Sequence, residues 1–153
     1  MTSQHHRSRW MLKQDAPQVL AIEEQSFSNP MDYDALKRLL ARRTTVAHVI
    51  EADDSEVIGF MIYRICTGKV YELIRLCIKP EHQGRGHGRA LLNSLKNKLT
   101  SNRRAIGVKV HERALAAQLF LKALGFTCID IQKQYGEEDI YLFEFDKYRA
   151  LAL

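Results

Sequence analysis

The sequence predicts a single domain of mixed α and β structure. Its 153 residues suit one hydrophobic core. Apolar runs with strand-like patterns and amphipathic segments with a helical period follow one another in the order β-α-α-β-β-β-α-β-α-β-β. No internal repeat or low-complexity linker divides the chain. We therefore expect one domain over residues 1–153, with residues 1–8 as a flexible tail.

The expected elements follow from apolar runs and the residues that bound them. The predicted strands are 10–12, 46–50, 57–63, 71–78, 105–110, 126–131 and 140–145. Two helices separate the first two strands; Asp15 is the expected N-cap of the first, and the second is expected to start near Asp32. A third helix follows a glycine-rich turn, and a fourth covers residues 114–124 before Gly125 ends it.

The glycine-rich turn organises the rest of the chain. It has glycine at every second position, Gly84, Gly86 and Gly88, after an apolar run and Pro80. Glycine permits positive φ and close approach of a ligand, and the free N–H groups of a helix's first turn attract an anion. The turn therefore predicts a phosphate-binding site. Its spacing fits neither a P-loop nor a dinucleotide fingerprint.

Composition excludes several other classes of protein. The net charge of +5 is scattered, and no basic run with interleaved aromatic residues indicates nucleic-acid binding. A polar N-terminus and the lack of long apolar stretches predict a cytoplasmic protein with no membrane association. Cys66, Cys77 and Cys128 show no CxxC spacing, which favours buried, reduced thiols. His5 and His6 have no further ligand at useful spacing, so we expect no metal site.

The segment Gln83–Gly88 fits the pattern Gln/Arg-x-x-Gly-x-Gly/Ala and resembles the GNAT family of acetyl-CoA-dependent N-acetyltransferases. The order of elements is similar to that family from Arg9 to Phe145. The resemblance implies an α+β fold with a largely antiparallel mixed sheet of about seven strands, splayed at strands 4 and 5 and flanked by about four helices. It also implies acetyl-CoA as cosubstrate.

In this family, backbone amides of the turn hold the pyrophosphate of coenzyme A. The residues that the resemblance places against the donor are Leu76, Cys77, Ile78, Gln83, Gly84, Arg85, Gly86, His87, Gly88 and Arg89. The backbone of residues 76–78 is expected to hold the oxyanion. His87 is expected to be a solvent-facing spacer.

Two further segments resemble the RimI-like branch, which contains ribosomal-protein-alanine and other protein N-terminal acetyltransferases. Residues 27–31 resemble its Phe-x-x-Pro-Trp segment, with Met31 in place of Trp. Residues 110–126 resemble its Val-Arg-x-x-Asn…Leu-Tyr-x-x-Leu-Gly-Phe segment. Three positions depart from the branch: Ala114 replaces a coenzyme-contacting Asn, Leu121 the general-acid Tyr, and Lys109 a Glu or His.

Because of these departures, other residues are needed for proton transfer. Glu72 is the leading general base, since it matches the position of the base in GNAT histone acetyltransferases. Its alternative is a structural carboxylate paired with Arg75 or a lysine. Tyr135 is the nearest substitute for the acid by family position, and its alternative is a surface tyrosine in a hairpin turn. His111 and Glu112 are secondary candidates that we interpret as the N-terminal cap region of a helix.

The sequence thus predicts acetyl transfer to a primary amine, with a protein N-terminal α-amine as the leading acceptor, in a ternary complex. A small amine, such as a polyamine or aminoglycoside, is an alternative acceptor. The lost Asn and Tyr also allow an inactive coenzyme-A-binding module. Neither the acyl group nor the oligomeric state is encoded in these patterns.

Overall fold

The computed structural model describes residues 6–151 and confirms the predicted α+β fold. The strands are β1 (Arg7–Trp10), β2 (Thr45–Glu51), β3 (Val57–Ile65), β4 (Val70–Ile78), β5 (Ala105–His111), β6 (Thr127–Gln132) and β7 (Ile140–Asp146). The helices are α1 (Ala16–Ser26), α2 (Tyr33–Leu40), α3 (His87–Lys96), α4 (Leu115–Ala123) and α5 (Lys147–Leu151), with short 3-10 turns at Lys13–Asp15 and Pro80–His82.

The seven strands follow the order β1-β2-β3-β4-β5-β7-β6. The β4–β5 pair is parallel, whereas β1–β2, β2–β3, β5–β7 and β6–β7 are antiparallel. The parallel pairing is short. It runs from Val70 opposite Ala105 to Leu73 opposite Val108, although β4 continues to Ile78. The two strands therefore stop pairing before either of them ends.

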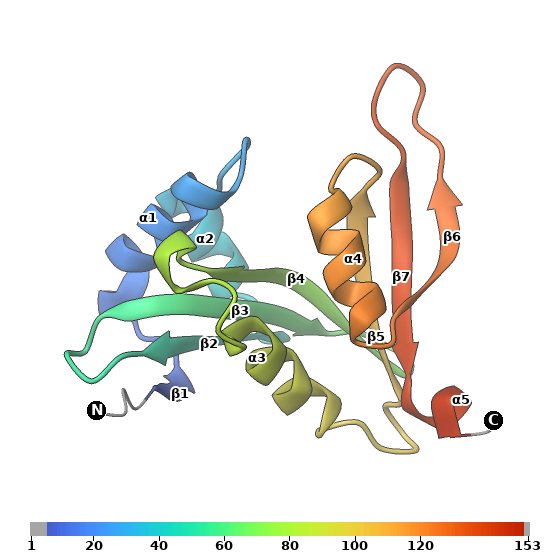
Figure 1. Ribbon diagram of the computed structural model, residues 1–153, viewed down its shortest axis with the longest axis horizontal. Coiled ribbons are helices and arrows are strands. Elements are labelled where there is room, and N and C mark those ends of the chain that lie inside the picture. The colour runs from blue at the N-terminus through green and yellow to red at the C-terminus, as the bar shows by residue number, and fades with distance from the viewer. Residues whose placement is uncertain (1–5, 152–153) are drawn as a thin grey trace. The chain divides into compact units, whose positions relative to one another are not determined.

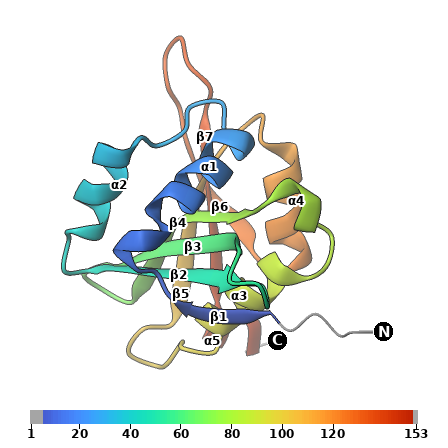
Figure 2. The same ribbon diagram turned by 90° about the vertical axis from the view of Figure 1, so that its left-hand side faces the viewer.

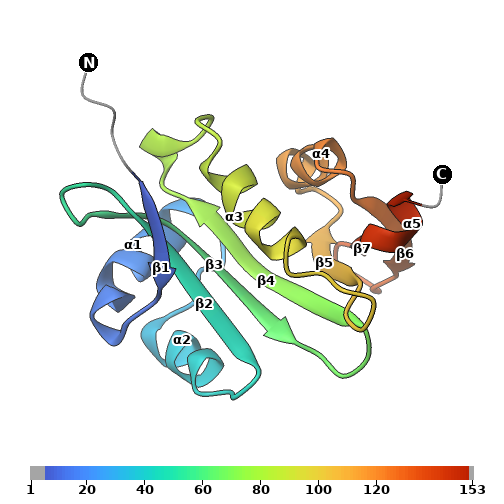
Figure 3. The same ribbon diagram turned by 90° about the horizontal axis from the view of Figure 1, so that it is seen from below.

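One compact unit contains residues up to 64 together with residues 75–94. Figure 2 shows its strands side by side from β1 to β4. In this unit α1 and α2 lie on one face of the strands and α3 on the other (Figures 1 and 3). Cover on both faces explains why β3 is buried from Val57 to Tyr63 and reads as a continuous apolar run.

The second unit contains residues 65–74 and the chain from residue 95 onward. Here β5 pairs with β7 along its whole length, and α4 lies against these strands (Figures 1 and 3). Helix α5 was not predicted. It is short and has no apolar period, but the Oδ1 atom of Asp146 accepts hydrogen bonds from the amides of Tyr148 (3.0 Å) and Arg149 (3.1 Å), which caps its start.

The N-terminal elements differ from the prediction. Strand β1 begins at Arg7, inside the expected tail, and residues 1–5 lie outside the described range. Its side chains do not alternate between apolar and polar, so the sequence pattern could not locate it. Helix α2 starts next to Asp32, as predicted, and Asp32 caps it by accepting from the amide of Ala35 at 2.8 Å. Asp15 occupies the predicted N-cap position of α1 but makes no capping bond from its side chain.

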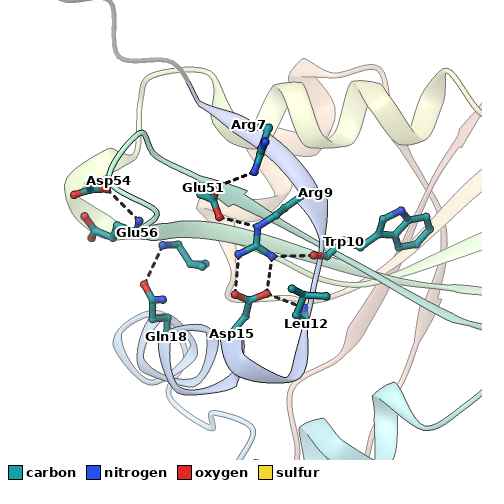
Figure 4. Close-up of polar contacts among 10 residues, drawn as sticks. Arg7, Arg9, Trp10, Leu12, Asp15, Gln18, Glu51, Asp54 and Glu56 are labelled. Atoms are coloured by element: carbon teal, nitrogen blue, oxygen red, sulfur yellow. Dashed lines mark hydrogen bonds and ion pairs between the residues drawn. The ribbon is translucent and has the colours of Figure 1, made fainter.

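Asp15 instead forms a buried ion pair that joins β1 to α1 and β2 (Figure 4). Both terminal nitrogens of Arg9 donate to its carboxylate at 2.8 Å, and Nε of Arg9 donates to Glu51 at 2.7 Å. The amide of Leu12 also donates to Asp15, at 2.7 Å. The hydrogen bonds from Arg9 lower the pKa of Asp15 although burial opposes them.

We predict that Asp15→Asn lowers the free energy of unfolding by about 3 kcal/mol, because it leaves a partly buried Arg9 short of its main partner. Urea denaturation monitored by circular dichroism measures this. Arg7→Ala is the matched control, since Arg7 bonds to Glu51 on the same network but its side chain is 74% exposed. This control should cost less than about 1 kcal/mol. Equal losses in the two variants would contradict the assignment.

The same ion pair predicts a pH dependence of stability. The pKa of Asp15 is lower in the folded protein than in the unfolded chain, so its stabilisation is complete at neutral pH and is lost as pH falls through the folded value. Between about pH 5 and about pH 2 the wild type should therefore lose stability more steeply than Asp15→Asn. Parallel acid-stability curves for the two proteins would show that Asp15 does not carry this effect.

Candidate functional site

The end of β4 is held in place by an unusually close contact with β3. A Cβ atom on Gly59 would lie 2.5 Å from Cδ1 of Ile78 and 3.0 Å from the carbonyl oxygen of Cys77, so only glycine fits there. The amide of Lys79 donates to the carbonyl of Ile58 at 2.7 Å. These contacts determine the point at which the chain leaves the sheet.

The turn that follows is built for close approach by a ligand. The side-chain amide of Gln83 donates to the carbonyl of Ile78 at 2.9 Å, which closes the turn on the strand end. Gly84 and Gly86 have φ angles of +78° and +88°, and a Cβ atom on either would meet nothing within 4 Å. Helix α3 begins directly afterwards, at His87. Open backbone followed by the N–H groups of a helix's first turn fits a diphosphate.

Positive charge lies on the same turn. Arg85 and Arg89 are exposed, one within the turn and one in the first turn of α3. Lys79, by contrast, forms a hydrogen-bonded ion pair with Glu56 and has Glu81 at 3.9 Å. The two arginines therefore give the turn a positive field that attracts a phosphate ligand.

His87 is not the solvent-facing spacer that the sequence predicted. Its ring packs edge-on against His6 with ring centroids 4.4 Å apart, and its Nε2 atom is buried without a hydrogen-bond partner among the described residues. Burial lowers the pKa of His87, and the nearby His6, His82 and Arg85 lower it further. The imidazole therefore stays neutral at pH 7 and adds no charge to the turn.

The ten residues predicted to bind the donor all lie in the first unit, from the last residues of β4 to the start of α3. Cys77 is among them, and burial raises the pKa of its thiol, which does not favour a nucleophile. The sequence predicted buried thiols for the cysteines, but only Cys77 is fully buried. Cys66 is half-buried, and Cys128 is exposed on β6. The two predicted catalytic residues, Glu72 and Tyr135, belong to the second unit.

Glu72 lies half-buried in the part of β4 that pairs with β5. The thiol of Cys66 donates to its carboxylate at 3.6 Å, and its register partner on β5 is Gly107, which has no side chain. Arg75, the suggested structural partner of Glu72, places its Nε 2.9 Å from Glu23. The role of Glu72 as general base stays a prediction.

Tyr135 lies in the loop between β6 and β7, which projects beyond the strands (Figure 1). Its side chain is fully exposed. The loop is closed by a 2.9 Å ion pair between Lys133 and Asp139 and by a 3.4 Å hydrogen bond from the amide of Glu137 to the carbonyl of Gln134. The structure thus describes a surface tyrosine at a loop tip, and its role as general acid stays a prediction.

The residues at the other positions compared with the RimI-like branch lie in or beside β5 and α4. Leu121 is 4% exposed and packs on the buried side of α4. Ala114 precedes the first residue of α4 and makes no capping bond. The buried side chain of Gln118 donates to the carbonyls of His111 and Glu112 at 3.1 and 2.9 Å. These two residues do not form the expected cap region, because His111 ends β5 and the N-cap position of α4 is Ala114. Lys109 is exposed on β5.

Sequence reasoning missed one buried carboxylate. Glu23 on α1 is 0% exposed and accepts hydrogen bonds from Nε of Arg75 at 2.9 Å and from the amide of Met31 at 3.1 Å. Its place on α1 was a usable signal, because Glu23 follows buried Ile22 directly and buried Val19 by four residues. A carboxylate at such a position is buried only when paired.

Within residues 6–151, no three histidine, cysteine or acidic side chains form a group that could hold a metal ion. Over the same range, no helix has the length and apolar character needed to cross a membrane.

Comparisons with known proteins show the family to which this chain belongs. The acetyltransferase (GNAT) family matches residues 11–126. The chain is 30% identical over 122 residues to a [ribosomal protein bS18]-alanine N-acetyltransferase of Haemophilus influenzae, covering 79% of this chain and 81% of the relative.

Solved structures show the same fold. The ribosomal-protein-S18-alanine N-acetyltransferase from Escherichia coli matches with a TM-score of 0.81 at 20% identity, over 93% of this chain and 94% of that one. A spermidine N-acetyltransferase SpeG chimera from Vibrio cholerae and hSSAT matches with a TM-score of 0.79 at 18% identity, over 97% and 99%. Because the family matches residues 11–126 and the Haemophilus relative is 30% identical, this chain belongs to the GNAT family of acetyltransferases.

Proposed function

We propose that this protein transfers the acetyl group of acetyl-CoA to the α-amine of a protein N-terminus, directly and within a ternary complex, in the cytoplasm. One observation carries the donor side: the open, positive-φ turn of Gly84 and Gly86 between the end of β4 and α3. The acceptor side is supported by the 30% identity to the ribosomal-protein alanine acetyltransferase, which covers about four-fifths of both chains.

The chemistry of the acceptor also favours an α-amine. At pH 7, deprotonation costs about 1 kcal/mol for an α-amine but about 4.6 kcal/mol for a lysine side chain. In the proposed reaction Glu72 takes this proton, directly or through water, and the amine nitrogen attacks the thioester carbonyl. The backbone of residues 76–78 stabilises the oxyanion. The C–S bond then breaks, and the thiolate is protonated by Tyr135 or by water.

Specific observations also support two alternative functions. The similarity to a spermidine N-acetyltransferase structure covers nearly the whole chain, so the fold does not separate a polyamine from a peptide acceptor. Buried Leu121 and apolar Ala114, at positions where the RimI-like branch has a Tyr and an Asn, favour an inactive acetyl-CoA-binding module.

Mass spectrometry separates these functions in one experiment. The full chain is incubated with acetyl-CoA and a panel containing peptides with free N-termini, the same peptides with blocked N-termini and a free lysine, and polyamines. We expect acetylation of the free α-amines. Acetylation of polyamines alone would replace the proposed acceptor, and binding of acetyl-CoA without any product would support the inactive module.

For the donor site, we predict that Gly86→Asp weakens acetyl-CoA binding more than tenfold in isothermal titration calorimetry. The substitution adds a side chain, a negative charge and backbone strain at a φ of +88°. Gly68→Asp is the matched control, because Gly68 also has a positive φ (+91°) and open space but lies in the β3–β4 turn. Similar losses in both variants would contradict the assignment of the donor turn.

For the general base, we predict that Glu72→Gln lowers kcat by about a hundredfold or more and removes the ascending limb of the pH–rate profile. Acetyl-CoA affinity should stay within about twofold, because Glu72 is not among the proposed donor-binding residues. Glu112→Gln is the control and should retain activity. Full turnover of Glu72→Gln with an unchanged pH profile would remove Glu72 from the mechanism.

A further inference from the structure

The carboxylate of Glu23 is held in an unusual way. It lies on α1 and is wholly buried, and one of its oxygens, Oε1, accepts both the bond from Arg75 and the bond from the Met31 amide. Its second oxygen, Oε2, is buried with no hydrogen-bond partner among residues 6–151. A buried carboxylate with one oxygen unsatisfied calls for an explanation.

Stability alone does not supply that explanation. Removing a carboxylate from water is costly, and a buried ion pair is often no better for stability than apolar residues of similar volume. Helix α1 already places Val19 and Ile22 on its buried side. An apolar residue at position 23 would continue that side without an unsatisfied oxygen. We therefore expect the charge of Glu23 to fix the positions of the groups that it binds.

Those partners connect β4 to the loop between α1 and α2. Arg75 lies on β4, directly before the residues 76–78 that are proposed to hold the oxyanion. Its guanidinium carbon lies 4.8 Å from the centroid of the Phe27 ring, at the start of the loop. Glu23 bonds Arg75 on one side and the amide of Met31, near the end of the loop, on the other. Both ends of the loop are thus tied to β4 through one ion pair.

The middle of the loop is exposed. Ser28, Asn29 and Pro30 all face solvent, while Phe27 and Met31 on either side are half-buried. An exposed segment whose two flanks are held is preorganised to contact a ligand without a large loss of conformational entropy on binding.

We propose that Glu23 and Arg75 are positioning residues that hold loop 27–32 in the conformation that receives the acceptor, and that they therefore determine acceptor affinity. This inference rests on the proposed function, because it takes the loop as part of the acceptor site. Neither residue is assigned a contact with the reacting atoms.

Glu23→Gln tests the charge of this pair while keeping its shape. The amide oxygen can still accept from Met31, but the ion pair with Arg75 is lost. We expect KM for the peptide acceptor to rise about tenfold, with KM for acetyl-CoA within about twofold, as one lost charge-assisted hydrogen bond implies. Glu24→Gln is the matched control, since Glu24 is the next residue on α1 and is exposed. It should leave both KM values unchanged.

Hydrogen–deuterium exchange gives a readout that does not depend on activity. In Glu23→Ala the Met31 amide loses its acceptor, so peptides covering residues 27–33 should exchange at least tenfold faster than in the wild type, while peptides from β7 should not change. Arg75→Lys keeps the charge but loses the planar guanidinium, and should raise peptide KM in the same direction as Glu23→Gln.

The results separate this inference from the proposed function. If peptide KM in Glu23→Gln and Arg75→Lys and loop exchange in Glu23→Ala all match the wild type, the positioning role is overturned although turnover stands. If the wild type acetylates no peptide, the proposed function fails. In that case, faster loop exchange in Glu23→Ala with unchanged acetyl-CoA affinity would limit the role of Glu23 to holding the loop.

Discussion

The hydrogen bond from the Gln83 side chain to the carbonyl of Ile78 is the contact on which the proposed donor site depends. It folds the chain back on the end of β4 within a few residues. Gly59 makes this possible from the other side, because its missing side chain leaves room for Ile78. With the strand end and turn held together, Gly84 and Gly86 keep their backbone open and α3 begins where its N–H groups can meet an anion.

Two buried ion pairs organise the rest of the first unit, and each holds a segment that has little apolar surface of its own. Arg9 and Asp15 attach β1, whose side chains are mostly exposed. Glu23 and Arg75 attach the exposed loop that follows α1. Paired charges of this kind contribute modestly to stability but impose a definite geometry.

The order of elements and the glycine turn between β4 and α3 were predictable from the sequence because apolar periodicity and glycine spacing are local signals. Strand β1 and helix α5 were not, since β1 depends on pairing with β2 and α5 on a cap from Asp146. His87 was misread because its burial depends on His6, far away in the sequence. Glu23 was overlooked although its place on the apolar side of α1 was a usable signal, because its partner Arg75 is distant along the chain.

The central claim is that the turn after β4 holds the pyrophosphate of the acetyl donor. A crystal structure of the protein with coenzyme A tests it most directly. The account predicts pyrophosphate oxygens about 3 Å from backbone nitrogens between Gly84 and Arg89. A pyrophosphate bound away from this turn, with Gly84 and Gly86 facing only solvent, would contradict it.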